Sequence, residues 1–420
     1  MTTQKLPGTH ARWLTAWQDN AVAYQSIHTF TDALSASKIE FPQYILLRSL
    51  WKKVEVTRAS LLTQHVSMAH IKAAEAELGK FNDWRAYLDA IRDGCKTTKN
   101  GSLALVRYYQ HLCLNTHSSP DDGGNDKIDN SPMQTRSRTR PPAQAQSDNI
   151  SEYSESSVEF ASAHAQTASW LSVQQGETAL NFPSTPNRNL TSGFASLTLS
   201  ATRRRRGESG NGSNWSDNPE NRPKKFQAVK DEQIVNTAII ILLNVLTISF
   251  SQTVGEWSLH RHPLCVQNNA SEKVFEARVD GIFTVEGEIR SILEVKPYLR
   301  DQNAAAEVAV CMQETAQMAA WISTHPPVDA LQNPKEQKYH RLMLAQDRHE
   351  IFVSVASFIG TYVRYICGEM DQAEYEESLT DGEGFLTISQ QGPYDAGSWE
   401  DMNTIGILIL AFSMQGCLLN

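Results

Sequence analysis

Two neighbouring stretches, Phe275-Glu-Ala-Arg-Val-Asp-Gly-Ile-Phe283 and Ile289-Arg-Ser-Ile-Leu-Glu-Val-Lys296, decide the fold of this chain. Both are rich in β-branched and aromatic residues, and the glycine-containing Val285-Glu-Gly-Glu-Ile289 separates them, so we expect a β-hairpin. Because side chains alternate along a strand, Glu294 and Lys296 share one face. Burying a carboxylate and an ammonium group in a largely apolar sheet is costly, so the pair indicates a functional role.

The register of this hairpin decides whether Asp280 can join Glu294. A three-residue turn at Glu286–Glu288, or a bulge with the same effect, places Asp280 opposite Glu294 on one sheet face. A plain two-residue turn places Asp280 opposite Leu293 instead and separates the carboxylates across the sheet. The hypothesis of a shared site therefore requires the odd register.

Two adjacent carboxylates repel each other, and a hard divalent cation such as Mg²⁺ removes this repulsion by taking oxygen ligands from both. The backbone carbonyl of Val295 can supply a third ligand. Lys296 can position or deprotonate an attacking water and stabilise charge on a phosphate. We therefore predict that Asp280, Glu294 and Val295 are metal ligands, and that Asp280, Glu294 and Lys296 are catalytic residues for phosphodiester hydrolysis.

The segments around the hairpin predict an α/β (α+β) domain over residues 226–420. Hydrophobic periodicity gives the order α-β-β-β-α-β, followed by a further strand. The expected elements are a helix at Val229–Phe250, strands at Gly255–Val266, Val274–Val285 and Ile289–Lys296, a helix at Ala304–Ile322, and strands at Arg341–Gln346 and Ile351–Phe358. Pro297 ends the third strand and leaves Glu294 and Lys296 near its end. The aliphatic run Ile405–Phe412 is expected to pack as a last helix or strand.

Asp280 followed by Glu294-Val295-Lys296, within this order of elements, resembles the PD-(D/E)XK nuclease superfamily. The resemblance covers residues 226–360 and implies a restriction-endonuclease-like αβββαβ core. It also implies that Asp280 and Glu294 bind Mg²⁺ or Mn²⁺ and that Lys296 supports the nucleophilic water. The sequence departs from the motif in having Val279 where the proline of the family name would stand.

A second partial match, Gln317-Met-Ala-Ala-Trp321, is similar to the Gln-x-x-x-Tyr element of the RecB-like branch, with tryptophan in place of tyrosine. Gln313 and Gln317 lie four residues apart on one helix face, so either can reach the site. Gln317 is therefore a further candidate catalytic residue, although glutamines are also ordinary on a surface helix. Glu232 and Glu256 are candidates for an additional acid or are structural.

Two other polar groups are interpreted as structural. His260-Arg261-His262 can touch phosphate, but no cysteine or third histidine completes a metal set nearby, so we expect a strand-end loop. Asp347-Arg348-His349-Glu350 separates two expected strands and is typical of a polar hairpin turn, although His349 and Glu350 could form an acid and base pair.

The N-terminal residues 1–115 are expected to form a small helical domain. Apolar residues recur there at steps of three and four, with helices expected at Tyr44–Val54, Ser60–Leu78, Trp84–Ile91 and Leu103–Leu114. The following 110 residues, 116–225, hold only 12 Leu, Ile, Val or Phe, too few to build a core. We expect a disordered linker there. It contains basic clusters that suit nuclear import or phosphate binding, or are incidental: Arg136, Arg138 and Arg140, then Arg203–Arg206, then Arg222, Lys224 and Lys225.

Composition and charge restrict the setting of the protein. The net charge of −9 does not attract phosphate, so nucleic-acid contacts must come from local basic groups. Six dispersed cysteines without zinc spacing favour a reducing compartment, and the first residues lack the apolar segment of a signal peptide. The run Ile234–Phe250 is short for a membrane span and contains two asparagines. We expect an intracellular and nuclear protein, with membrane attachment through this run as an alternative.

The sequence thus favours a magnesium-dependent nuclease with nucleic acid as its partner, DNA ahead of RNA. The alternative is a catalytically inactive nuclease-fold protein that acts as a nucleic-acid or protein interaction module. The acidic net charge favours this alternative. The oligomeric state, the substrate polarity and the role of the N-terminal helices stay open.

Overall fold

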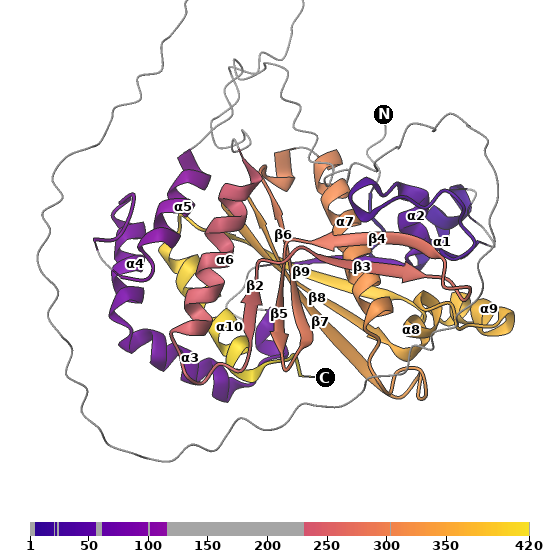
Figure 1. Ribbon diagram of the computed structural model, residues 1–420. Helices are drawn as coiled ribbons and strands as arrows, with labels where there is room; N and C mark the ends of the chain where they lie inside the picture. Colours follow the sequence, from indigo (N-terminus) through magenta and orange to yellow (C-terminus); the bar gives the residue numbers. More distant parts are fainter. Residues whose placement is uncertain are drawn as a thin grey trace, which may run out of the picture. The chain divides into compact units, whose positions relative to one another are not determined.

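The computed structural model of the chain describes residues 5–20, 22, 25–55, 61–99, 101–115, 231–302 and 304–419. These residues form a mixed α/β structure with a helical N-terminal region and a mixed sheet (Figure 1). The expected linker at 116–225, with its basic clusters, lies outside the described residues. The described segments on either side of that gap belong to one compact unit. The expected boundary between a helical domain at 1–115 and a domain at 226–420 therefore does not separate two packing units.

The helices and strands of the described residues follow in chain order. The α-helices are α1 (His10–Asp19), α2 (Phe41–Leu46), α3 (Met68–Lys80), α4 (Asn82–Arg92), α5 (Ala104–Asn115), α6 (Glu232–Ile248), α7 (Ala304–Thr324), α8 (Gly360–Ile366), α9 (Gln372–Asp381) and α10 (Trp399–Gln415). The strands are β1 (Ser49–Val54), β2 (Glu256–Ser258), β3 (His262–Gln267), β4 (Lys273–Val279), β5 (Gly281–Val285), β6 (Glu288–Lys296), β7 (Lys338–Asp347), β8 (Glu350–Ile359) and β9 (Leu386–Asp395). The short 3-10 helices are η1 (Ala36–Lys38), η2 (Leu61–Gln64) and η6 (Arg300–Gln302).

A seven-stranded sheet in the order β1-β9-β8-β7-β6-β5-β2 is the centre of the fold, and β3 and β4 form a separate antiparallel pair. β1 runs parallel to β9, and β6 runs parallel to β7. The other neighbouring strands of the large sheet are antiparallel. Parallel neighbours need a long crossover, and α7 supplies it between β6 and β7.

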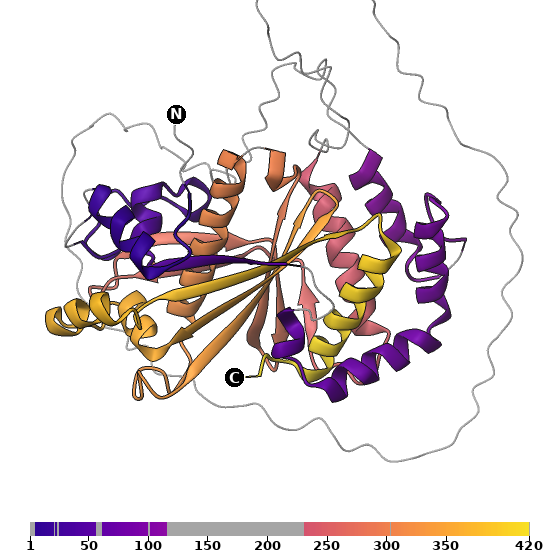
Figure 2. The same cartoon turned by 180° about the vertical axis from the view of Figure 1, so that it is seen from behind.

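The large sheet has a hydrophobic core on each face. One core combines Ile292 of β6 with side chains of α1, α2, α7 and α8. The other combines Leu293 and Val295 with side chains of α3 to α6 and α10. Figures 1 and 2 show these two groups of helices on opposite sides of the strands. The alternation expected along β6 is therefore confirmed from Ile292 onward, where the even-numbered positions face α7.

The N-terminal region contributes a strand as well as helices. The helix expected at Tyr44–Val54 is wrong beyond its start, because α2 ends at Leu46 and Arg48 adopts a positive φ of 49°. Residues 49–54 then pair with β9 as β1. Periodicity alone favoured a helix here, but pairing with a distant strand overrides local propensity.

Helix α6 corresponds to the apolar run that the sequence analysis considered as a membrane segment. Asp231 caps its first turn, and Asn244 donates its side-chain amide to the Ile240 carbonyl at 3.0 Å. The helix packs against α5, α10 and the sheet. In the described part of the chain, no helix combines the length and apolar character needed to cross a membrane.

Two of the expected strands are each divided in the structure. The expected strand Gly255–Val266 consists of β2 and β3, and the expected strand Val274–Val285 consists of β4 and β5. Asp280 occupies the break between β4, which pairs only with β3, and β5, which belongs to the large sheet. This aspartate therefore lies where the chain passes from one sheet to the other. The run Ile405–Phe412 is part of α10, in agreement with the helical alternative.

Candidate active site

The turn between β5 and β6 contains two residues. Glu286 and Gly287 adopt positive φ angles of 52° and 82°, and Val285 pairs directly with Glu288. Two consecutive positive φ angles are the geometry that lets a tight turn match the twist of a hairpin. The expected three-residue turn is therefore wrong.

A bulge within the hairpin restores the odd register. Arg290 has no partner on β5, and beyond it Gly281 faces Leu293. The Asp280 N–H donates to the Leu293 carbonyl at 2.8 Å, so Asp280 shares Leu293 with Gly281 at the end of the paired segment. Asp280, in the break before β5, is nevertheless a neighbour of Glu294, because its carboxylate accepts the N–H of the next residue, Val295, at 3.1 Å and adds to the raised pKa of Glu294. The bulge at Arg290 gives the hairpin the register that the shared site requires.

Glu294 is buried, and three side chains donate hydrogen bonds to its carboxylate. Lys296 Nζ and Gln313 Nε2 each lie 2.5 Å from Oε1, and Gln317 Nε2 lies 2.5 Å from Oε2. Gln317 also donates to the Arg278 carbonyl at 2.9 Å. The structure thus brings Lys296 and both candidate glutamines to one carboxylate.

Asp280 is also buried, and it has a different set of partners. Its Oδ2 accepts the Val295 N–H at 3.1 Å, and Arg261 Nε lies 3.2 Å from Oδ1. The same guanidinium lies 3.2 Å from a carboxylate oxygen of Glu232, at the start of α6. Arg261 therefore bridges two acids, a role beyond that of the expected strand-end loop, and Glu232 reaches the neighbourhood of the site. Glu256, the other candidate acid, is exposed at the start of β2.

The nearby cations do not fully offset the cost of burying the two carboxylates of this site. Burial raises the pKa of Glu294 to about 7, with a further rise from Asp280 and an opposing effect of Lys296. Burial and the nearby Glu232 raise the pKa of Asp280. Burial lowers the pKa of Lys296, but the carboxylate of Glu294 outweighs it, so the net change is upward. Lys296 is therefore held as an ammonium ion, which favours the charge-stabilising role over deprotonation of a water.

A second cluster of buried charges lies nearby, and we call Arg300, Glu314 and Asp347 the Arg300 cluster. Arg300 Nη2 lies 2.6 Å from Glu314 Oε1, and Arg300 Nε lies 2.6 Å from Asp347 Oδ2. Gln390 donates to Glu314 at 3.2 Å, and the Arg300 guanidinium lies 3.8 Å from the centre of the Phe352 ring. The three charges come from η6, α7 and β7, which meet only in the folded chain.

The sequence analysis missed the Arg300 cluster. It interpreted Asp347-Arg348-His349-Glu350 as a polar turn, and the turn between β7 and β8 is confirmed, but Asp347 is buried. A signal was present in Glu314, which follows Gln313 within the otherwise apolar sequence of α7. An ionised residue inside an apolar helix requires a buried partner.

Trp321, the last residue of the second partial match, belongs to α7, and its side chain lies in the core between that helix and the sheet. Its side chain is fully buried, and the Arg341 guanidinium lies 4.7 Å from the centre of its ring. Gln317 instead contacts Glu294 directly. The two ends of the motif thus have different surroundings, and Gln317 is the one that belongs to the site.

The donor set suits a hard divalent cation in its chemistry. The two buried carboxylates of Asp280 and Glu294 have raised pKa values, and the fully buried Gln317 Oε1 accepts no hydrogen bond from the described residues. Among the described residues, however, no three or more His, Cys, Asp or Glu side chains are grouped so that they could hold a metal ion. Ligation by Asp280, Glu294 and the Val295 carbonyl stays a prediction.

Comparison with protein-family models, curated proteins and solved structures finds no match to this chain. The chemistry of the site must therefore be inferred from its own geometry.

Proposed function

We propose that the protein is a divalent-metal-dependent nuclease that hydrolyses phosphodiester bonds, in DNA ahead of RNA. The observation that carries this proposal is the proximity of the buried Asp280 and Glu294 carboxylates, with Lys296 Nζ 2.5 Å from Glu294. Two acids and one protonated lysine at a strand end are the groups that metal-assisted phosphodiester hydrolysis requires.

The path of the chain supports a restriction-endonuclease-like core, which is part of the proposal. Helix α6 precedes the antiparallel strands β2, β5 and β6, and α7 then leads to β7, parallel to β6. This is the order α-β-β-β-α-β, with the pair β3 and β4 inserted between its first two strands. The candidate residues lie where β4 gives way to β5 and at the end of β6.

Each side chain of the site has a proposed task. Asp280 and Glu294 would hold Mg²⁺ or Mn²⁺, and the bound ion would polarise the phosphate and make a bound water more acidic. Lys296, held as an ammonium ion by Glu294, donates hydrogen bonds to a phosphate oxygen and stabilises its growing charge. Gln317 fixes the orientation of the Glu294 carboxylate, because it is fully buried and bound to a backbone carbonyl as well.

Two half-exposed arginines beside the acids support nucleic acid as the substrate. The side chains of Arg261 and Arg278 are 47% and 53% exposed; Arg261 contacts Asp280 and Glu232, and Arg278 contacts Glu276, so a phosphate would replace a carboxylate partner at either arginine. A chain with a net charge of −9 needs such local cations to hold a phosphate backbone. Phosphate contacts of this kind position a nucleic acid without reading its sequence.

A second candidate function is a nuclease-fold interaction module without catalytic activity. All four carboxylate oxygens of Asp280 and Glu294 already accept hydrogen bonds or ion pairs from the protein. A site with its charges satisfied in this way can also persist as a structural element. This observation favours the module, and a cleavage assay separates the two functions.

The test compares cleavage of plasmid and single-stranded DNA by the full-length protein with Mg²⁺, with Mn²⁺ and with a chelator. We expect metal-dependent cleavage by the wild type and a loss of about 10²-fold or more in both Glu294→Ala and Lys296→Ala. Matched controls are Glu377→Ala and Lys335→Ala, which remove the same residue types from an exposed ion pair of 3.1 Å. Both controls should cleave at the wild-type rate.

Equal cleavage by the wild type, Glu294→Ala and Lys296→Ala would show that the activity comes from another site or from a contaminant. Absence of cleavage in all of them with either metal would remove the enzyme. In that case, retained binding of labelled DNA by the wild type would support the interaction module.

A further inference from the structure

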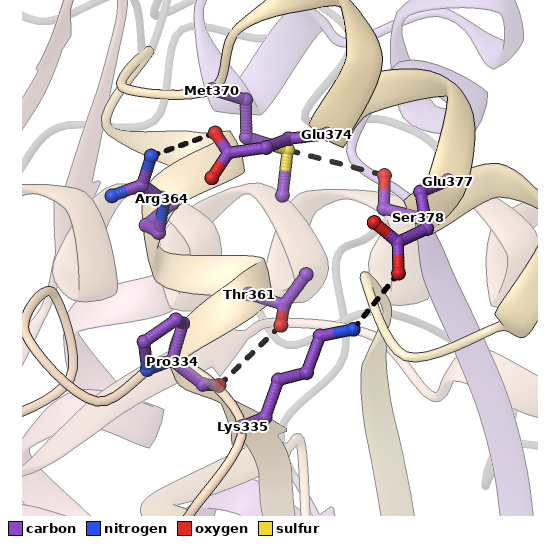
Figure 3. Close-up of a pocket in the computed structure, with 8 residues that line it drawn as sticks. All are labelled: Pro334, Lys335, Thr361, Arg364, Met370, Glu374, Glu377 and Ser378. Carbon is purple, nitrogen blue, oxygen red and sulfur yellow. Dashed lines mark hydrogen bonds and ion pairs between the residues drawn. The ribbon is translucent and has the colours of Figure 1, made fainter.

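Two of the hollows on the described surface are lined in part by lysine, and they differ in how the lysine charge is neutralised. Figure 3 shows the smaller hollow, of about 70 Å³, where Lys335 points toward Glu377 and Arg364 points toward Glu374. These ion pairs measure 3.1 and 2.7 Å. Each cation of this hollow has a carboxylate partner, so an incoming anion would have to displace one.

The larger hollow, which we call the basic hollow, has a volume of about 240 Å³ and lies over β1, β9, β8 and β7 beside η2. None of its described lining residues is an aspartate or a glutamate. Most of them carry a basic or a hydroxyl group, including Lys52, His65, Lys338, His340, Ser357 and Thr387.

The strand register explains why these polar residues gather. His340 of β7 pairs with Ser357 of β8, and Ser357 pairs in turn with Thr387 of β9. In the neighbouring row, Lys52 of β1 pairs with Ser389 of β9. Directly paired residues point to the same face of a sheet, so the hydrogen-bond donors of these two sets of paired residues lie side by side.

The cations of the basic hollow have no counter-charge from the described residues. Neither Lys52 nor Lys338 forms an ion pair there, whereas Lys53, the neighbour of Lys52 in β1, contacts Glu307. The rings of His65 and His340 lie with their centres 4.2 Å apart and their planes tilted by 50°, and His340 Nδ1 shares a hydrogen bond of 2.8 Å with Ser357 Oγ.

The histidines of the basic hollow are kept neutral by their surroundings. Burial lowers the pKa of His340 to about 4, and His65 and Lys338 add to the effect. Burial also lowers the pKa of His65, with an added effect of Lys338. A dianion in contact with these groups would reverse the repulsion and favour the protonated rings.

The basic hollow is separate from the acid residues of β4 to β6. Glu294 pairs with Ala345 of β7, five residues beyond His340, which corresponds to about 17 Å along the strand. His340 also lies on the opposite face, since Leu342 and Leu344 of the same parity pack in the core opposite α7. A ligand of the basic hollow would not touch the proposed catalytic residues.

We propose that the basic hollow binds a phosphate-sized dianion, either free phosphate or the terminal phosphate of a small phosphomonoester. Lysine ammonium groups and serine and threonine hydroxyls donate hydrogen bonds to anionic oxygens, and such charge-assisted bonds are strong. The volume is smaller than that of pockets for drug-sized ligands, which start at about 300 Å³. A compact anion matches both the size and the chemistry.

Binding is tested by isothermal titration calorimetry of the full-length protein with four probes. We expect saturable binding of sulfate, inorganic phosphate and methyl phosphate, and binding of the monoanion dimethyl phosphate that is at least about tenfold weaker. Tighter binding of methyl phosphate than of inorganic phosphate identifies a phosphomonoester as the ligand class, and the reverse order identifies free phosphate. Equal binding of dimethyl and methyl phosphate would overturn the proposal, because a diester backbone would then be the ligand.

Variants assign the binding to the basic hollow. The double variant Lys52→Gln with Lys338→Gln should bind inorganic phosphate at least about tenfold more weakly than the wild type. The matched control Lys53→Gln removes one lysine charge from the same strand and should bind within a factor of about two. Glu294→Ala should also bind as the wild type, so the outcome is independent of nuclease activity.

Two further readouts keep this test decisive. Both lysines are exposed, so the double variant should unfold at the wild-type temperature without anions, which excludes loss of folding as the cause. Sulfate keeps its charge near neutral pH, and its addition should shift the ring-proton resonances of His65 and His340 in the wild type. Absence of saturable binding at millimolar concentrations, or equal binding by the double variant and Lys53→Gln, would remove the proposal.

Discussion

The Arg300 cluster and the site around Asp280, Glu294 and Lys296, which we call the acid centre, use the same ingredients in different ways. Each combines two buried carboxylates with a cation. In the Arg300 cluster one guanidinium, 4% exposed, contacts both carboxylates. In the acid centre the cations are separate and more exposed, at 13% for Lys296 and 47% for Arg261. Exposure of the cation thus distinguishes a closed structural network from a site that a ligand can enter.

Burial opposes ionisation of a carboxyl group in both sites. Burial lowers the pKa of Arg300, but Asp347 and Glu314 outweigh it and raise that pKa well above its ordinary value. Burial raises the pKa of Glu314 in this cluster, and it raises the pKa of Glu294 in the acid centre to about 7. A planar guanidinium group that contacts two carboxylates at once neutralises them better than a lysine ammonium group that contacts only one. A further cation bound at the acid centre would therefore stabilise its ionised carboxylates.

The largest expected effect is on stability, from Arg300→Met. This change leaves Glu314 and Asp347 buried without their cation and should lower the free energy of unfolding by about 3–5 kcal/mol. Lys296→Met should cost less, under about 2 kcal/mol, because Glu294 can take up a proton. Urea unfolding at pH 7 measures both values.

A triple variant provides the control for this prediction. Arg300→Met combined with Glu314→Gln and Asp347→Asn removes all three charges and should recover at least half of the loss. Equal losses in Arg300→Met and Lys296→Met would contradict the distinction between a closed cluster and an open centre.

The next effect concerns Gln317, which fixes Glu294 within the acid centre. Gln317→Met keeps the size of the side chain but removes donors to Glu294 and the Arg278 carbonyl. We expect the Mg²⁺ concentration for half-maximal cleavage to rise by about 10- to 100-fold, and stability to fall by about 1–2 kcal/mol. Gln313→Met, which removes a donor that shares its acceptor oxygen with Lys296, should have a smaller effect on both. A larger effect of Gln313→Met would reverse the assignment.

A smaller effect depends on pH and concerns Glu350, beside the Arg300 cluster. Burial raises the pKa of Glu350 to about 7, and Asp301, Asp347 and Asp395 add to the rise. The folded state thus binds this proton more tightly than the unfolded state, so Glu350 costs stability as pH rises from about 4.5 to 7. Glu350→Gln should gain about 1 kcal/mol over the wild type across this range and no more above it.

Thermal unfolding of the wild type and Glu350→Gln at several pH values checks this prediction. A stability difference between the two proteins that does not change with pH would show that Glu350 does not have a raised pKa in the folded state.

The smallest expected effect on stability comes from Arg261→Gln. The guanidinium bridges Glu232 and Asp280, but it is half exposed, and such ion pairs contribute under about 1 kcal/mol. Chemical denaturation should therefore detect little change, whereas binding of labelled DNA should weaken because a phosphate contact is lost. A stability loss as large as that of Arg300→Met would mean that the acid centre is also closed.

The acid centre could be anticipated from the sequence because its elements are close in the chain. Alternation along β6 placed Glu294 and Lys296 on one face, and the structure confirms that alternation. A shared site with Asp280 required either a three-residue turn or a bulge, whereas a plain two-residue turn would have separated the carboxylates. The sequence could not choose between them, because the bulge at Arg290 depends on pairing across the whole hairpin.

The rest of the fold depends on contacts between distant segments. The sequence pattern predicted that residues 49–54 belong to a helix. It could not show that they form a strand, because the strand they pair with, β9, lies far away in the sequence. The Arg300 cluster and the basic hollow likewise combine residues from several elements whose proximity no local pattern reveals. Periodicity reports which face a residue occupies, but not which strand will lie beside it.

The pairing of β1 with β9 also bears on how the chain folds. Among the described strands, β1 comes first in the chain and β9 last, and the Leu61 N–H donates to Gln391, 330 residues further along. Closing so long a loop costs entropy, so the hairpins from β5 to β8 should assemble first and β1 should join late. Until β9 arrives, β1 lacks a partner and the edge of β8 is open. Both are surfaces through which chains associate with one another, so synthesis that stops before Leu386 should yield an aggregating protein.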